Sequence, residues 1–190
     1  MRYVWSWPGL MIIMVMAAII NFLLTPATAL IPILVTKHFA GGAFQLAWIE
    51  SAWGFGVLAG GLTLSAWGGC QRRILTTMLG LLVMGVGMTL IGLMPASAFW
   101  LTVALFFVAG VMNPLINGPL FAVVQAVVAP EMQGRVFTLL MSAAGAMSPL
   151  SLIVAGPIAD RLGVQSWFVV GGVITVVMGL SGFFIPAVMN

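Results

Sequence analysis

Charged residues are almost missing from this chain of 190 residues. Six Lys/Arg and three Asp/Glu make up only 5% of the sequence, whereas hydrophobic residues make up 63%. A soluble domain carries about 25% charged residues, so these few charges cannot cover a surface that faces water. Lipid must contact most of the chain, and the composition predicts an all-α protein of the membrane.

Other scarcities exclude several kinds of chemistry. Cys70 is the only cysteine, which excludes an internal disulfide and CxxC chemistry. His38 is the only histidine and has no cysteine or carboxylate beside it, so we expect no metal and no cofactor. No GxSxG motif or other catalytic pair accompanies it, and we expect no enzyme. The net charge is +3, but the sequence has no basic cluster beyond Arg72 and Arg73, which argues against nucleic-acid binding.

The uncharged stretches set the number of membrane crossings. A transmembrane helix needs about 20 apolar residues, and the uncharged block 74–130 has room for two, with a turn at 94–98. We predict one domain over residues 1–190 with six transmembrane helices. Their expected positions are about 10–35, 47–66, 74–94, 99–125, 137–158 and 166–187.

The positive charges predict the orientation. Six crossings place both termini on one side of the membrane. If the termini are cytoplasmic, the inner segments hold Arg2, Arg72, Arg73 and Arg135. The outer segments then hold only Lys37 and Arg161. Since cytoplasmic segments carry the excess of Lys and Arg, we predict cytoplasmic termini.

A short pattern recurs half a chain length apart. The second span ends with Gly61 and Gly68 in a G-x6-G pattern, and the fifth ends with Gly156 and Gly163 in the same pattern. Three spans followed by three would form the 3+3 inverted repeat of secondary transporters. The alternative is chance similarity among glycine-rich spans.

Polar residues inside two spans are candidates for substrate contact. Asn113 and Asn117 share a face of the fourth span, and Gln125 follows two turns later. Asn21 and Thr25 form a similar stripe on the first span. Polar groups at membrane depth are tolerated where they line a cavity. The alternatives are hydrogen bonds between helices and, for threonine, a bond to its own helix.

Glu50 is a candidate for proton coupling. It lies just inside the second span, where an ionisable group is costly and is a functional hypothesis by default. Burial raises the pKa of a carboxyl group, which then exchanges protons near neutral pH. The alternative is a solvated carboxylate at the outer membrane interface.

Small residues form stripes that we interpret as helix packing surfaces, since they let helices approach closely. Gly56 and Gly60 form a GxxxG pattern on the second span. Gly145, Pro149 and Gly156 line the fifth span.

Several segments resemble a known family. Residues 125–137 (QAVVAPEMQGRVF) resemble the Q-x(3,4)-P-E-x-x-G-R-V-F joint between helices ten and eleven of drug exporters in the major facilitator superfamily. Residues 148–150 and 155–163 resemble the rest of helix eleven in the same group, and residues 48–56 resemble helix eight of its macrolide-efflux branch.

The resemblance implies a proton-driven antiporter for drugs or other lipophilic molecules in a bacterial cytoplasmic membrane. It implies that the six spans are helices seven to twelve, the carboxyl-terminal half of the fold. It also places two loops in the cytoplasm, with the motif residues Gly61, Gly68, Arg72, Arg73, Glu131 and Arg135. Ser65 and Ala66 replace the Asp-Arg pair of the first loop's motif, so a latch that depends on this aspartate is not expected here.

Members of this superfamily have twelve helices, and six are predicted here. We therefore expect a partner, either an amino-terminal half or a second copy of the chain, in addition to the bilayer. The alternative is a six-span fragment or membrane assembly subunit that does not transport.

Overall fold

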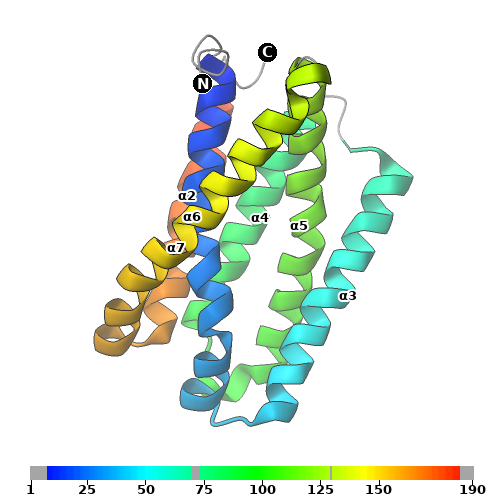
Figure 1. Cartoon of the computed structure of the whole chain (residues 1–190). Helices are drawn as coiled ribbons and strands as arrows, with labels where there is room; N and C mark the ends of the chain where they lie inside the picture. The colour runs from blue at the N-terminus through cyan, green and yellow to red at the C-terminus, as the bar shows by residue number, and fades with distance from the viewer. Residues whose placement is uncertain (1–7, 70–72, 129, 185–190) are drawn as a thin grey trace.

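The computed structural model describes residues 8–69, 73–128 and 130–184, and every regular element in these ranges is helical. A π-helix, η1 (Leu34–His38), continues the first helix, and a 3-10 turn, η2 (Ala96–Ala98), precedes the fourth. The α-helices are α2 (Pro8–Ile33), α3 (Ala43–Trp67), α4 (Arg73–Leu93), α5 (Phe99–Val127), α6 (Pro130–Leu162) and α7 (Val164–Phe184). They form a bundle in which α6 crosses in front of α2 (Figure 1). The predicted all-α class is confirmed.

Each predicted span overlaps one α-helix, although residues 185–187 of the last span lie outside the described residues. Within the described residues, four segments are long and apolar enough to cross a membrane. These are Ala18–His38, Ile74–Leu93, Ala96–Ala122 and Val164–Gly182. Helix α3 falls outside this set because it carries Gln45 and Glu50 among glycines and tryptophans. The charges of α6 lie at its two ends, and its middle, residues 136–159, carries none. Membrane crossing by α3 and α6 stays a prediction.

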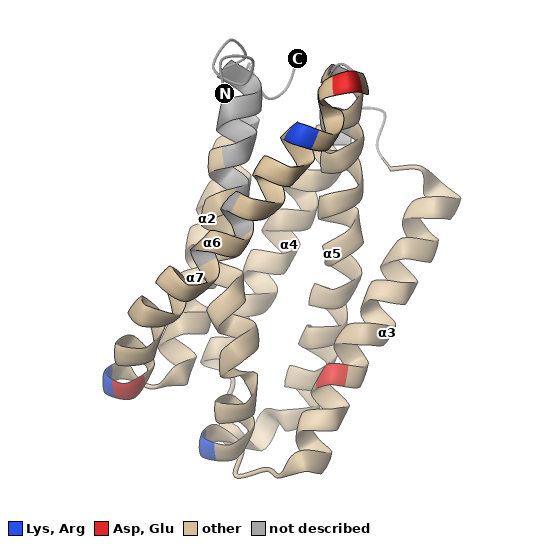
Figure 2. Cartoon of the chain, in the orientation of Figure 1, with Lys and Arg blue, Asp and Glu red and all other residues tan. Residues whose placement is uncertain are grey.

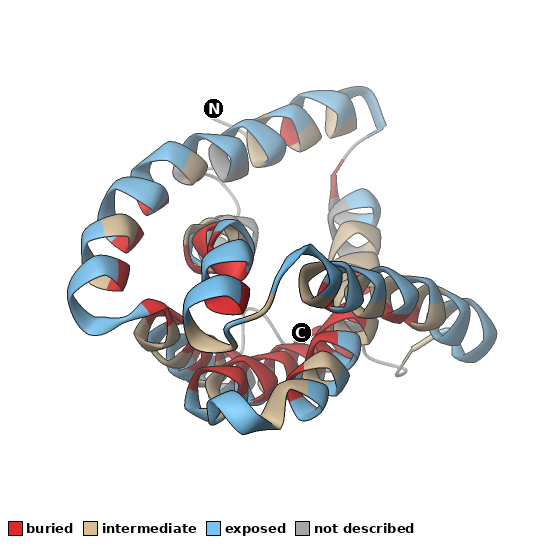
Figure 3. Cartoon of the chain, turned by 90° about the horizontal axis from the view of Figure 1, so that it is seen from below, coloured by how far each residue is buried: buried red, intermediate tan, exposed pale blue. Residues whose placement is uncertain are grey.

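The described charges lie mainly at the two ends of the bundle (Figure 2). Lys37 lies in η1, after α2, and Asp160 and Arg161 lie at the end of α6. Glu131 and Arg135 lie on the first turns of α6, at the opposite end of the bundle (Figure 1). Between these ends the helix surfaces are apolar. Their outward-facing residues are exposed (Figure 3). This distribution fits a bilayer around the middle of the bundle.

Glycines allow two helix pairs to pack backbone against backbone. A Cβ atom at Gly56 of α3 would overlap the carbonyl oxygen of Phe107, and one at Gly60 would overlap that of Val111. In the pair α4–α7, a Cβ atom at Gly85 would lie 2.8 Å from the carbonyl oxygen of Gly172. Small residues are needed at these positions because the helix axes could not otherwise come so close.

The recurring G-x6-G pattern has a local cause at its second glycine. Gly68 ends α3 in the left-handed conformation with φ 75°, and its N–H donates to the carbonyl of Leu64 at 2.8 Å. Gly163 follows α6 with φ 84°. Both are helix C-terminal glycines, which adopt positive φ at no steric cost. Helix termination therefore accounts for this half of the pattern without an inverted repeat.

We predict that Gly56→Ala destabilises the bundle and that Gly54→Ala does not. The added methyl group at position 56 would push α3 away from α5, at a cost of about 1–3 kcal/mol. No atom lies within 4 Å of a Cβ at Gly54, and alanine is the better helix former there. Thermal unfolding in detergent should give a lower midpoint for the first variant only. Equal midpoints would show that the α3–α5 contact does not support the fold.

Candidate functional site

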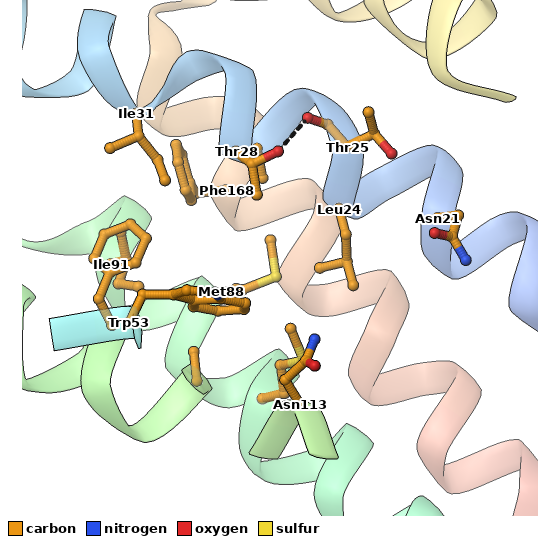
Figure 4. A pocket seen from close by; sticks show the side chains of 14 residues that line it. Asn21, Leu24, Thr25, Thr28, Ile31, Trp53, Met88, Ile91, Asn113 and Phe168 are labelled. Atoms are coloured by element: carbon orange, nitrogen blue, oxygen red, sulfur yellow. Dashed lines mark hydrogen bonds between the residues drawn. The ribbon is translucent and has the colours of Figure 1, made fainter. Parts of the chain in front are cut away.

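A cavity of about 230 Å³ lies inside the bundle and is lined by residues of α2, α3, α4, α5 and α7 (Figure 4). Three of the predicted substrate-contact residues meet there. Asn21 and Thr25 lie one turn apart on α2, and Asn113 lies on the facing side, on α5. The sequence separation between the two groups is large, so it is the packing of α2 near α5 that brings them to one cavity.

Some polar side chains of the cavity form hydrogen bonds with the backbone of their own helix, and others point into the cavity. The hydroxyl of Thr28, which also lines the cavity, donates to the backbone carbonyl of Thr25 at 2.8 Å. This is the bond to the same helix that threonine often makes in apolar surroundings. The amide of Asn113 points toward Leu24 across the cavity (Figure 4).

Aromatic and thioether side chains form the apolar walls. Trp53 comes from α3, and Met84 and Met88 come from α4. Phe106 and Phe168 meet edge to face with ring centroids 6.4 Å apart. Flat rings and flexible thioethers provide apolar surfaces that adapt to different molecules.

The cavity is electrically neutral. None of the described residues that line it is Asp, Glu, Lys, Arg or His. Burying a charged molecule there would leave its charge unpaired at a high desolvation cost. The lining therefore suits an uncharged lipophilic molecule that forms a few hydrogen bonds.

Two hydrogen bonds between helices position the walls. The indole N–H of Trp167 on α7 donates to the carbonyl of Leu23 on α2 at 3.0 Å. The hydroxyl of Thr77 on α4 donates to the carbonyl of Ile116 on α5 at 3.1 Å. Neither role could be predicted from the sequence, because a tryptophan near a span end and a threonine in an apolar run are both common.

Two of the other polar candidates lie outside the cavity. The side-chain amide of Asn117 donates to the backbone carbonyl of Asn113 at 3.0 Å, within α5. Gln125 is exposed near the end of α5, and its backbone carbonyl accepts from the amide of Gln133 at 2.9 Å. The side chain of Asn117 therefore bonds within its own helix and not to the cavity.

Glu50 also lies outside the cavity, exposed on α3 and one helical turn before Trp53. It is separated from the cavity lining by this single turn. The structure therefore places the predicted proton-coupling residue beside the cavity and not within it.

The predicted loop residues lie at one end of the bundle. Glu131 and Arg135 are exposed on the first turns of α6, and Gly68 ends α3. Gly61 has no atom within 4 Å of a Cβ position. Arg73 begins α4, and Arg72 lies outside the described residues.

Helices α3 and α6 each present an uncovered face. On α3, Phe55 and Leu62 are 66% and 73% exposed, and Gly54 has no neighbour within 4 Å. On α6, Ile153 is 70% exposed, and the predicted packing residues are equally open. Gly145 and Gly156 have no atom within 4 Å of a Cβ position, and Pro149 is exposed. Only Gly56 and Gly60, among the predicted packing glycines, contact another described helix.

Comparison with known proteins identifies relatives of the chain. It is 31% identical to macrolide efflux protein A of Streptococcus pyogenes, over 90% of this chain and 42% of that protein. It is 28% identical to the multidrug efflux pump Tap of Mycolicibacterium fortuitum, over 98% of this chain and 45% of the pump. An uncharacterized MFS-type transporter of Bacillus subtilis is 29% identical over 78% of this chain and 36% of its own length. No protein-family profile matches the chain.

The described helices include four that could cross a membrane, and the relatives are transporters, not enzymes. The chain is homologous to these macrolide and multidrug efflux proteins, as its motifs predicted, and it is similar to part of a transporter of the major facilitator type. It spans less than half the length of the curated relatives it matches.

We predict that a cysteine at position 25 is accessible and one at position 175 is not, in a Cys70→Ser background. Thr25 lines the cavity, whereas Thr175 is fully buried and its hydroxyl donates to the carbonyl of Gly171. A small maleimide should alkylate Thr25→Cys at least about tenfold faster than Thr175→Cys, because thiol reactivity requires exposure. Alkylation in denaturant measures the total number of reactive thiols in each variant. Equal rates in the folded protein would mean that the cavity is closed.

Proposed function

We propose that this chain is one half of an efflux transporter for drugs or other lipophilic small molecules, working by proton-coupled alternating access. The observation that carries the proposal is the neutral cavity at which Asn21, Thr25 and Asn113 meet. Homology to macrolide and multidrug efflux proteins supports efflux as the direction of transport.

The lining of the cavity supports lipophilic molecules as substrates. Its walls are aromatic rings and thioethers, and its polar groups are amides and hydroxyls without charge. Such a surface binds by apolar contact, while a few hydrogen bonds fix orientation. Molecules with carbonyl or hydroxyl groups on an apolar body fit this pattern.

The size of the cavity supports a missing second half. Drug-sized molecules occupy pockets of roughly 300–1,000 Å³, and this cavity measures about 230 Å³. The uncovered faces of α3 and α6 supply the surface on which a second six-span unit would pack. We infer that this chain corresponds to helices seven to twelve, and that an amino-terminal half or a second copy completes the site.

Glu50 is the proposed site of proton coupling. It is the described carboxylate that lies away from the helix ends, and it stands one turn from Trp53 in the cavity wall (Figure 2). Packing of a second half against α3 would enclose this carboxylate beside the cavity, and an ionisable group enclosed in the membrane is a candidate for proton exchange. The proposed location is the bacterial cytoplasmic membrane, with both termini in the cytoplasm.

The second candidate function is a six-span subunit or fragment without transport of its own. The uncovered faces of α3 and α6 favour it, because a chain with such surfaces needs another protein before it can enclose a substrate.

Transport by the chain alone would separate these functions. The chain would be expressed in a bacterium that lacks its own exporters, and accumulation of a lipophilic dye would be followed with and without an uncoupler. We expect lower accumulation in cells that carry the chain, and loss of the difference when the uncoupler is added. Membrane insertion is checked by immunoblotting of the membrane fraction. Inserted protein without any effect on accumulation would favour the second function.

Two variants test the proposed roles. Glu50→Gln should abolish the dye export that depends on the proton gradient, since an amide cannot exchange protons. Dye accumulation in cells with this variant should then be the same with and without the uncoupler. Asn113→Leu should weaken export, whereas Asn117→Leu should leave most of it, because the Asn117 amide bonds within its own helix. Equal losses in the two asparagine variants would contradict the assignment of the cavity as the substrate site.

A further inference from the structure

A second cavity, of about 470 Å³, lies at the end of the bundle opposite the loop residues Glu131 and Arg135. Its lining comes from the last turns of α2 and η1, the last turns of α6, and the first turn of α7. It shares no residue with the neutral cavity. The Ala18–His38 membrane-span segment ends here, so the cavity lies at the level of lipid headgroups.

Two opposite charges line this cavity. Lys37 comes from η1 and Asp160 from α6, and both are exposed. No ion pair within 4.0 Å joins these two side chains, both of which are described. Charges of opposite sign that share a cavity without pairing favour an occupant that carries both charges itself.

The helix ends strengthen this polarity. Val164 and Gln165 form the first turn of α7, where unpaired N–H groups attract an anion. Asp160 lies in the last turns of α6, where unpaired carbonyl groups attract a cation. The cavity therefore contains groups that favour an anion, Lys37 and the first turn of α7, and groups that favour a cation, Asp160 and the last turns of α6.

An apolar face of α2 continues from the cavity toward the middle of the bundle. Leu30, Ile33 and Lys37 are spaced by three and four residues, so they share one side of the helix. Leu30 is 6% exposed and Ile33 is 37% exposed. Ile33 therefore provides apolar surface for a hydrocarbon chain one helical turn before Lys37.

Contacts within the protein hold the wall of the cavity. The Nε2 atom of His38 lies 2.9 Å from the carbonyl oxygen of Met94 and 3.0 Å from the amide nitrogen of Gln165. These contacts link η1 to the α4–α5 turn and to the start of α7. The shape of the cavity is therefore set without the occupant.

We propose that this cavity binds the headgroup of a phospholipid that carries both a phosphate and a primary ammonium group, as phosphatidylethanolamine does. The phosphate lies beside Lys37 and the first turn of α7. The ammonium donates hydrogen bonds to the carboxylate of Asp160. A quaternary ammonium cannot donate such bonds, and a glycerol headgroup lacks the positive charge, so both competing lipids bind more weakly.

Native mass spectrometry of the purified full-length chain would test this proposal. Phosphatidylethanolamine, phosphatidylcholine and phosphatidylglycerol with identical acyl chains would be titrated separately. We expect about fivefold tighter binding of phosphatidylethanolamine, the effect of one charge contact near the membrane surface. Lys37→Gln and Asp160→Asn should each remove this preference. Arg161→Gln is the control, because Arg161 is exposed beside Asp160 and does not line the cavity.

Binding of phosphatidylethanolamine can also be compared with binding of its N-methylated derivatives on the unsubstituted chain. This comparison tests the proposal even if a substitution prevents folding. Equal binding of the three lipids, or a preference that persists in both cavity variants and is lost in Arg161→Gln, would overturn the proposal. The result does not depend on whether the chain transports, so it is separable from the proposed function.

Discussion

The close approach of helix backbones at glycine positions is the contact on which this bundle depends. Lipid tails are as apolar as leucine, so no hydrophobic force draws transmembrane helices together, and packing must hold them. Gly56 brings α3 against α5, and Gly85 brings α4 against α7. At both positions a carbonyl group of the partner helix occupies the space of a side chain. The two pairs are thereby fixed, and α2 packs against α7 of the second pair and against α6.

The neutral cavity follows from this arrangement. Helix α2 is held at its edge by the Trp167 indole, which donates to the carbonyl of Leu23, next to the turn that carries Thr25. Helix α5, which faces α2 across the cavity, supplies Asn113, and the walls between the two helices are apolar. The carboxylate of Glu50 lies outside the lining. In the proposed transporter, substrate contact and proton exchange therefore occur at neighbouring but separate places, linked through the single turn of α3 that carries Trp53.

The uncharged stretches of the sequence predicted six segments that each overlap one α-helix, because a helix in lipid needs a long apolar run. Helix α6 nevertheless begins at Pro130, before its predicted start at 137. They did not predict which residues meet. Asn113 and Asn117 share a helix face by periodicity, yet one lines the cavity and the other bonds to its own backbone, a choice made by side-chain rotamer and neighbouring helices. Trp53 was missed because tryptophans near span ends usually lie at the membrane interface. The glycines of α6 were expected to pack, but the described part of the chain provides no helix for them to contact.

The central claim is that a lipophilic substrate binds in the neutral cavity. Photoaffinity labelling tests it most directly: a macrolide carrying a diazirine is irradiated with the purified chain, and the adducts are mapped by peptide mass spectrometry. The account predicts adducts on α2 between Asn21 and Ile31 and on α5 between Phe106 and Asn113, both prevented by excess unlabelled macrolide. Adducts confined to the uncovered faces of α3 and α6, unaffected by competition, would contradict it.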